Sequence, residues 1–133
     1  MPKRILVVDD ERQIVKLVEI NLERAGYEVV TAYSGVEALE KVQSEKPDIL
    51  VLNDRMPKMN GWEVLKKLQA DPDTEAIPVI FLMEATQDAD IFAAWQAGVS
   101  AYVPQSPLNA RELLTFVQRI FESLESNPPS YEE

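Results

Sequence analysis

Two neighbouring carboxylates and one carboxamide stand where aliphatic runs of the sequence end. Asp9 and Asp10 follow the run at residues 5–8, and Asn53 follows the run at residues 49–52. Carboxylate and amide oxygens are ligands that hard divalent cations accept. An amide is not a nucleophile, because its nitrogen lone pair is delocalised and the group carries no charge. The chemistry open to these residues is therefore cation binding, or hydrogen bonding between the Asn53 amide and the acidic pair.

The composition excludes several other kinds of chemistry. The chain has no histidine and no cysteine, which removes the commonest general base and all thiolate or disulfide chemistry. Its net charge of −10 repels nucleic-acid phosphates and anionic membrane surfaces. No apolar run approaches the roughly 20 residues of a membrane span, and the run before Asp9 is too short for a signal peptide. A cytoplasmic location is expected.

Short aliphatic runs alternate with segments of helical periodicity along nearly the whole chain. Strands are predicted at residues 5–8, 28–32, 49–52, 79–82 and 101–103. Helices are predicted between them, the later ones at about 62–70, 88–97 and 110–124. This alternation predicts an α/β domain at residues 3–124, with a doubly wound, five-stranded parallel sheet covered on both faces. Residues 125–133 are expected to form a disordered acidic tail.

The first two predicted helices have recognisable apolar faces and ends. The first ends before Gly26, and the second is capped by Ser34. Their expected core-facing residues are Ile14, Leu17, Val18, Asn21, Leu22 and Ala25 in the first helix, and Val36, Leu39 and Val42 in the second. In such a sheet the working site lies at the carboxyl ends of the strands, so Asp9, Asp10, Asn53, Met83 and the turn after Val103 should lie together.

Four stretches carry a resemblance to a known family: "ILVVDDE", "KPDILVLNDRMPKMNGWEVL", "IPVIFL" and "AGVSAYV". Together they resemble the CheY-like receiver domain of two-component response regulators over about residues 3–122. The resemblance implies a flavodoxin-like (βα)5 fold with strand order 2-1-3-4-5. It also implies an aspartate after the third strand that accepts a phosphoryl group from a sensor kinase. In the family an acidic pair holds Mg²⁺, and a Thr or Ser and a Lys contact the phosphoryl group.

This sequence departs from the family pattern at three of those positions. The acidic pair is present as Asp9 and Asp10, but the acceptor position, four residues before Pro57, is Asn53. The Thr or Ser position is Met83, and the Lys position is Gln105, or Ser106 if one residue is inserted. Because the acceptor, the hydroxyl and the cation are all replaced, we expect a degenerate pseudo-receiver. It would work in signal transduction independently of phosphorylation, and it would not be an enzyme.

Asp9 and Asp10 could simply be an anionic pair at the start of the first predicted helix, whose dipole favours carboxylates. Within the site, two further interpretations of the pair stay open. Asp9, Asp10 and the backbone carbonyl of Arg55 could hold Mg²⁺, because two carboxylates without a lysine carry the same formal charge as the family's three carboxylates with one. Loss of one charged ligand makes this binding weak, in the millimolar range or weaker. Alternatively, the Asn53 NH₂ group donates to Asp9 or Asp10 and replaces the metal.

Three further residues near this pocket were considered for chemical roles. Asp54 is a poor substitute for the acceptor, because side chains alternate along a strand and the spacing to the Met–Pro pair selects Asn53. Met83 is expected to fill space in the core. Glu84 is expected to be a solvated residue at the rim.

The resemblance implies partner contact through the fourth helix, the fifth strand and the fifth helix. Ile91, Ala94 and Trp95 share one helical face, which favours core packing, while an exposed part of Trp95 or Tyr102 would make an interface anchor. Phe116 belongs to the same surface. Tyr102 holds the position of the family's switching aromatic residue, and we expect it to point outward in a single conformation.

The expected function is contact with a protein partner, such as a sensor kinase, another regulator or an output protein, without nucleic acid or membrane. One alternative is a receiver cut from a longer regulator that has an output domain. A second is a Mg²⁺-dependent enzyme using Asp9 and Asp10, although the chain lacks an evident nucleophile and any histidine. A third is a small-molecule binder in the manner of flavodoxin.

Overall fold

Five parallel strands form the sheet predicted from the aliphatic runs. The computed structural model describes residues 2–84, 88–105 and 107–126. The strands are β1 (Arg4–Val8), β2 (Glu28–Ala32), β3 (Ile49–Asn53), β4 (Val79–Met83) and β5 (Ala101–Pro104). Their order is β2-β1-β3-β4-β5, which confirms the predicted topology. Every residue of β3 and β4 is buried, as expected for central strands covered on both faces.

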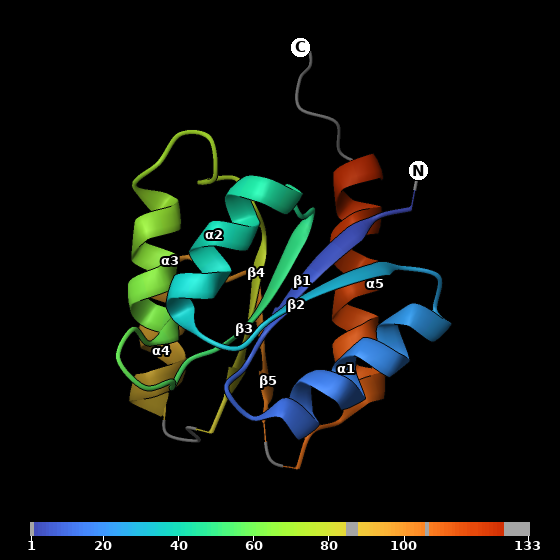
Figure 1. Cartoon of the computed structure of the whole chain (residues 1–133), viewed down its shortest axis with the longest axis horizontal. Helices are drawn as coiled ribbons and strands as arrows, with labels where there is room; N and C mark the ends of the chain where they lie inside the picture. The colour runs from blue at the N-terminus through green and yellow to red at the C-terminus, as the bar shows by residue number, and fades with distance from the viewer. Residues whose placement is uncertain (1, 85–87, 106, 127–133) are drawn as a thin grey trace.

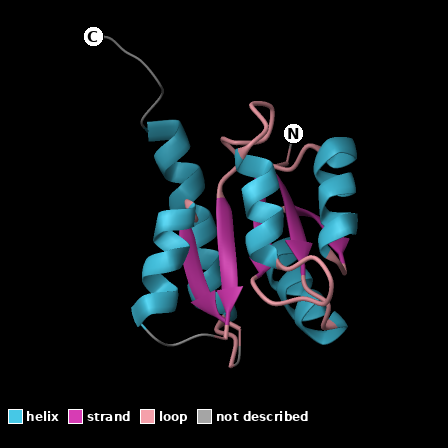
Figure 2. Cartoon of the chain, turned by 90° about the vertical axis from the view of Figure 1, so that its left-hand side faces the viewer, coloured by secondary structure: helices cyan, strands magenta, loops and turns pink. Residues whose placement is uncertain are grey.

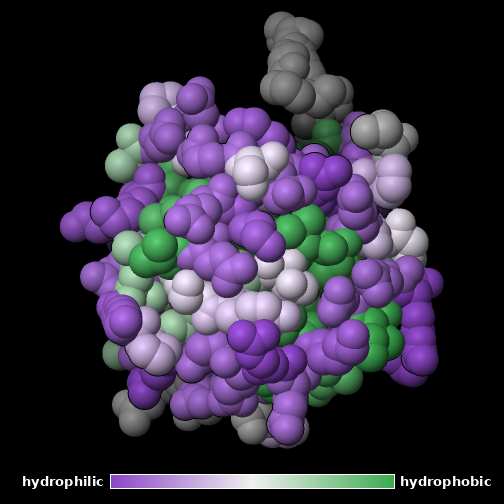
Figure 3. All heavy atoms as spheres, in the orientation of Figure 1, coloured by the Kyte–Doolittle hydropathy of each residue, from purple (hydrophilic) through white to green (hydrophobic). Residues whose placement is uncertain are grey.

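Helices cover both faces of this sheet (Figures 1 and 2). They are α1 (Arg12–Arg24), α2 (Gly35–Glu45), α3 (Gly61–Gln69), α4 (Asp88–Ala97) and α5 (Ala110–Ser126). α1 and α5 pack on one face and α2, α3 and α4 on the other, so the sheet separates two hydrophobic clusters. Among the described residues, no helix is long and apolar enough to cross a membrane. The face seen in Figure 3 is largely hydrophilic, with apolar residues in small separate patches.

The helix starts follow from local side-chain chemistry. The Ser34 hydroxyl accepts a hydrogen bond from the Glu37 N–H, as its predicted capping role requires. Asn60 and Glu63 form a reciprocal capping box at the start of α3. This cap directs the chain from the end of β3 back onto the sheet, and so fixes the loop that borders the carboxyl edge.

Some predicted helix faces are rotated from those observed. In α1, Leu17 is 41% exposed and Val15 takes its place in the core, so the buried stripe is Val15, Val18 and Leu22. In α2, Val36 is 53% exposed and Ala38 is buried instead. Both errors come from counting a large aliphatic side chain as inward when helix docking selected a smaller neighbour.

The last helix runs two residues past the predicted domain edge at 124, and residues 127–133 of the predicted tail lie outside the described residues.

Lys46 gives a testable measure of backbone strain. It follows α2 in the left-handed conformation, with φ 51° and ψ 60°, and its N–H donates to the Val42 carbonyl. A side chain with a Cβ is disfavoured in this conformation and glycine is not. Lys46→Gly should raise the free energy of unfolding by about 0.5–1 kcal/mol, measured by urea denaturation. Lys46→Ala keeps the Cβ and serves as the control; an equal gain from alanine would contradict the explanation.

Candidate functional site

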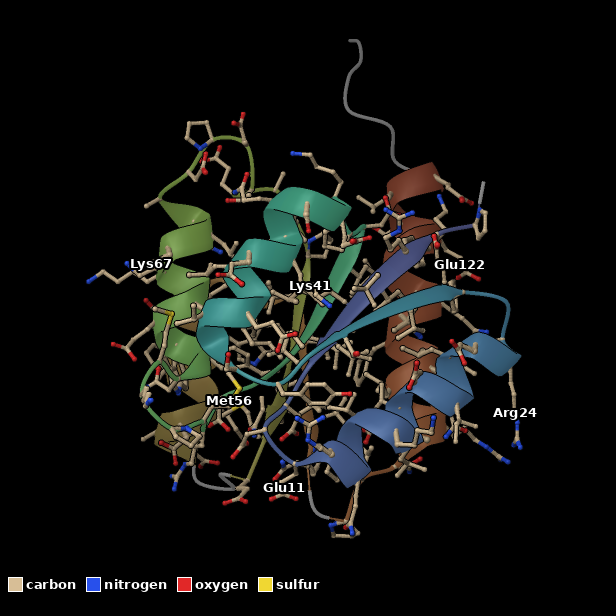
Figure 4. The ribbon with its side chains drawn as sticks, viewed as in Figure 1. Glu11, Arg24, Lys41, Met56, Lys67 and Glu122 are labelled. Atoms are coloured by element: carbon tan, nitrogen blue, oxygen red, sulfur yellow. The ribbon has the colours of Figure 1, made fainter. Side chains whose placement is uncertain are left out.

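The predicted site residues meet at the carboxyl edge of the sheet, the lower edge of the view in Figure 1. In the parallel register Val8 lies beside Leu52, which brings the following residues Asp9 and Asn53 together. Asp9, Asn53 and Gln105 have at most 3% of their surface exposed, whereas Asp10 is exposed. Glu11, labelled at the bottom of Figure 4, marks the point where the chain leaves this edge and enters α1.

Two side-chain amides, one at the end of β3 and one just after β5, donate to the acidic pair. The Asn53 Nδ2 atom donates to Asp9 Oδ1 at 3.0 Å and to Asp10 Oδ1 at 3.3 Å. The Gln105 Nε2 atom donates to Asp9 Oδ2 at 2.9 Å. On its other side, Asn53 Oδ1 accepts the Arg55 N–H at 3.2 Å, which fixes the orientation of the Asn53 amide. These hydrogen bonds correspond to the second interpretation of the acidic pair, in which the Asn53 NH₂ group donates to Asp9 and Asp10.

Asp9 is a carboxylate without a cationic partner in this network. Its burial raises its pKa above the ordinary carboxyl range. Hydrogen bonds from the Glu11 N–H, Gln105 and Asn53 oppose this rise, and the charge of Asp10 adds to it. Neutral dipoles therefore stabilise the Asp9 charge in place of a metal ion or a lysine.

The donor set fits a divalent cation poorly. Both Asp9 oxygens accept amide protons, from Gln105 on one oxygen and from Asn53 and the Glu11 N–H on the other. A cation needs these lone pairs, and the amide protons occupy the same space. Over residues 2–84, 88–105 and 107–126, no three acidic, histidine or cysteine residues are grouped so as to hold a metal. Weak Mg²⁺ binding through Asp9, Asp10 and the Arg55 carbonyl stays a prediction, and it requires Asn53 and Gln105 to turn away.

The other two replaced positions differ in how the structure places them. Met83 is 1% exposed and packs into the cluster under α2, α3 and α4, so its side chain belongs to the core and offers no hydrogen-bond donor. Gln105 occupies the position beside Asp9, and its backbone N–H donates to the Met83 carbonyl. Ser106, the other candidate for the lysine position, lies outside the described residues. Glu84 is exposed, as expected for a rim residue.

Asp54 is an unusual buried carboxylate that the sequence interpretation undervalued. It is 2% exposed, and its Oδ1 atom has no hydrogen-bond partner in the described part of the chain. Burial raises the pKa of Asp54, the Arg55 charge lowers it, and Glu84 and Asp90 raise it further. Among the described residues, Asp54 makes no hydrogen bond to Asp9 or Asp10, so it does not join the network of the acidic pair. The available signal was an acidic residue directly after a fully buried strand.

The burial of Asp54 predicts a stability that depends on pH. Because its pKa in the folded state is raised above the ordinary value of 3.8, the folded protein binds the proton more tightly than the unfolded chain. Stability should therefore fall as pH rises from 3.8 through the raised pKa. Asp54→Asn should flatten this part of the profile and raise the free energy of unfolding at neutral pH by about 1–2 kcal/mol.

Urea denaturation across the acidic range measures this effect. The exposed Asp73, changed to Asn, is the matched control for loss of one negative charge. An Asp54→Asn profile parallel to that of the wild type would mean that Asp54 is solvated in the folded state.

Trp95 on α4 and Tyr102 on β5 lie next to each other. The prediction that Ile91, Ala94 and Trp95 pack into the core is wrong for Trp95, which is 50% exposed, while Ala94 is fully buried. α4 docks through its smallest side chains, which leaves the large ring outside. Tyr102 is partly buried, and its ring lies edge-on to Trp95 with centroids 6.0 Å apart.

Comparisons with known proteins agree with this architecture. A family model described as the response regulator receiver domain matches residues 5–118. The alkaline phosphatase synthesis transcriptional regulatory protein PhoP of Bacillus subtilis is 40% identical over 132 residues, which are 99% of this chain and 54% of that protein. The response regulator MprA of Mycobacterium ulcerans is 39% identical over 114 residues, 86% of this chain and 48% of that protein. The chain thus spans about half the length of these curated relatives.

Solved structures show the same fold. The chemotaxis protein CheY4 of Vibrio cholerae superposes with a TM-score of 0.83 at 31% identity, covering 90% of this chain and 99% of that chain. A CheY-like receiver domain protein from Methanospirillum hungatei gives a TM-score of 0.85 at 28% identity, covering 95% of this chain and 98% of that chain. The family match, the strand order and the acidic pair at the carboxyl edge lead to one conclusion: the chain belongs to the family of response regulator receiver domains.

Proposed function

We propose that this receiver transmits its signal without phosphorylation, through contact with a protein partner. The observation that carries the proposal is the Asn53 amide, which stands at the acceptor position and donates to both Asp9 and Asp10. A phosphoryl group must be attacked by a nucleophile with an available lone pair, and the amide provides none. The same donations fill the space that the phosphoryl group and a metal would share.

The two supporting positions strengthen this interpretation. Phosphoryl transfer needs positive charge or hydrogen-bond donors on the transferred oxygens. Gln105 is neutral and already bound to Asp9, and Met83 is buried and lacks a hydroxyl. Loss of the acceptor alone would leave the rest of the machinery in place. Loss of the acceptor, the hydroxyl and the cation together supports a different role for the pocket, as a fixed structural centre of a domain that binds a partner.

The expected result of a phosphodonor experiment is that the protein stays unmodified. The purified chain is incubated with acetyl phosphate and Mg²⁺, or with a sensor kinase, and analysed by intact-mass spectrometry. Asn53→Asp combined with Gln105→Lys is the positive control, because it returns a nucleophile and a cation. A stable phosphoryl adduct on any aspartate of the wild type, Asp54 included, would overturn the proposal.

A second proposal concerns the larger protein in which such a domain can act. The relative from Bacillus subtilis is named a transcriptional regulatory protein and is about twice as long as the matched segment. This favours a role of the segment as the receiver part of a transcriptional regulator. Its charge of −10 makes this segment a poor ligand for nucleic acid, so DNA contact would belong to another part. The mass of the natural protein, measured after immunoprecipitation from cells, tests this second proposal: a mass well above that of the 133-residue chain supports it, and a mass equal to that of the chain contradicts it. A cytoplasmic location stays a prediction.

A further inference from the structure

Helix α4 carries an apolar face that is exposed among residues 2–84, 88–105 and 107–126. Ala94 is the one buried residue of this helix, all of whose residues are described. Phe92 is 64% exposed and Trp95 is 50% exposed, and they lie one turn apart on the same face. A helix that is apolar on most sides normally lies inside a protein. Two large aromatic rings left in water on such a helix indicate a binding surface.

A groove continues this surface onto β5 and α5. The Trp95 ring stands edge-on to Tyr102, at an interplanar angle of 77°, and forms one wall. The groove has a volume of about 250 Å³ and is lined by Trp95, Ala101, Tyr102, Pro104, Glu112 and Phe116. Aromatic walls around a small hollow suit the insertion of one large apolar side chain from a partner.

The charges on the α4 side of this groove are acidic, whereas α5 carries both signs, with Arg119 in a neighbouring pocket that Phe116 also lines. Between residues 76 and 110 the sequence has no lysine or arginine. Asp88 and Asp90 stand in the first turn of α4, and Asp88 is one turn before Phe92. Glu112 lines the groove from the first turn of α5. The nearest basic residue in sequence is Arg111, on α5 next to Glu112.

The charges on α4 disfavour an interface in which α4 and β5 pair with the same elements of a second copy. A two-fold interface brings the same patch together from both partners. α4 and β5 contain no basic side chain, so the acidic groups of one copy would find no cation on those elements of the other. Like charges brought together across an interface oppose association.

We infer that the partner is a basic protein segment with an apolar side chain that enters the groove beside Trp95 and Tyr102. Lysine or arginine residues flanking that side chain would meet Asp88 and Glu112, and Phe92 would pack on the segment. The inference rests on the proposed function, because it names the partner of a receiver that signals by contact. The surface itself is one that the family resemblance implies; its chemistry is particular to this chain.

The experiment compares two model peptides of the same length and helical leucine face, one with lysine and one with glutamate on the polar face. Binding of the fluorescently labelled peptides to the intact protein is measured by anisotropy over a range of salt concentrations. We expect the lysine peptide to bind, and the glutamate peptide not to bind. Phe92→Ser should weaken binding of the lysine peptide at least about tenfold, since aromatic anchors dominate such interfaces.

Matched variants separate this site from general attraction to an acidic protein. Val36→Ser removes an apolar residue that is 53% exposed on α2, and should leave binding unchanged. Glu112→Gln should weaken binding and reduce its salt dependence, whereas Glu23→Gln on α1 should not. Equal effects of Phe92→Ser and Val36→Ser would overturn the inference. So would a sedimentation result in which the wild type dimerises and Phe92→Ser does not.

These outcomes are independent of the phosphodonor experiment. A phosphoryl adduct on the wild type would overturn the proposed function, but it would not change the peptide-binding results. If the lysine peptide bound all variants equally, the inference about the partner would be overturned. The proposal that the domain is not phosphorylated would not be affected.

Discussion

Changing Asn53 to aspartate is expected to lower the free energy of unfolding by about 2–4 kcal/mol at neutral pH without divalent cations. The change removes the N–H donors to Asp9 and Asp10 and puts a third negative charge in their place. Asp9 is fully buried, so water cannot screen the repulsion on its side of the pocket. The substitution that would return the family's acceptor should therefore destabilise this fold.

The loss should depend on pH and on Mg²⁺. In the variant, repulsion and burial raise the pKa of the clustered carboxyls above their ordinary value in the unfolded chain. The destabilisation is then complete above the raised pKa, fades as pH falls through that pKa towards the ordinary carboxyl value, and is absent below it. Millimolar Mg²⁺ should recover part of the stability, because three carboxylates give a cation the ligands that it lacks in the wild type.

Urea denaturation followed by circular dichroism, with and without Mg²⁺, measures both effects. Asn53→Ala is the control, since it loses the same donors without adding charge; it should be destabilised less and should respond to Mg²⁺ less than Asn53→Asp does. An Asn53→Asp protein as stable as the wild type at neutral pH, without Mg²⁺, would show that the amide network contributes little.

The same substitution alone is not expected to make the domain switch. Met83 is buried at the position of the family's hydroxyl and has no donor that could move toward a phosphoryl analogue. Gln105 supplies no positive charge. A ligand shifts a conformational equilibrium only if it binds the two states with different affinity. Asn53→Asp with beryllofluoride and Mg²⁺ should therefore leave the surroundings of Tyr102 unchanged, whereas adding Met83→Thr and Gln105→Lys should produce a response.

Amide chemical shifts with and without beryllofluoride provide the measurement. The triple variant should show changes that reach Tyr102 and α5, and the single variant should show changes near residue 53 at most. Large shifts at Tyr102 in the single variant would contradict this prediction. They would mean that loss of the acceptor alone prevents the domain from changing conformation.

The sequence was sufficient for the fold because the strands are unambiguous. Runs such as residues 49–52 are apolar throughout and end at a polar residue, which identifies a central parallel strand and its exit point together. The position of Asn53 beside Asp9 follows from that topology. The choice between Gln105 and Ser106 does not, because it depends on how the chain turns after β5. In the structure Gln105 donates to Asp9, and Ser106 lies outside the described residues.

Helix orientation and partner surfaces were harder to predict. Leu17 and Val15 fit the same periodic pattern about equally well, and only docking of α1 on the sheet selects Val15. Trp95 was assigned to the core because it shares a helical face with Ala94. Periodicity does not reveal that α4 approaches the sheet through an alanine and leaves its aromatic rings outside. Burial of Asp54 likewise depends on how the start of α3 packs against the end of β3, where the Gly61 N–H donates to the Asp54 carbonyl.

The amide donors on Asp9 also have a consequence for how such a protein is regulated in a cell. A domain with a covalent trigger can be turned on and off while its copy number stays constant. Under the proposed function, a pocket satisfied by its own Asn53 and Gln105 has no such trigger. Occupancy of the partner then follows mass action alone, and synthesis and degradation of the two proteins become the means by which the cell sets the strength and duration of the signal.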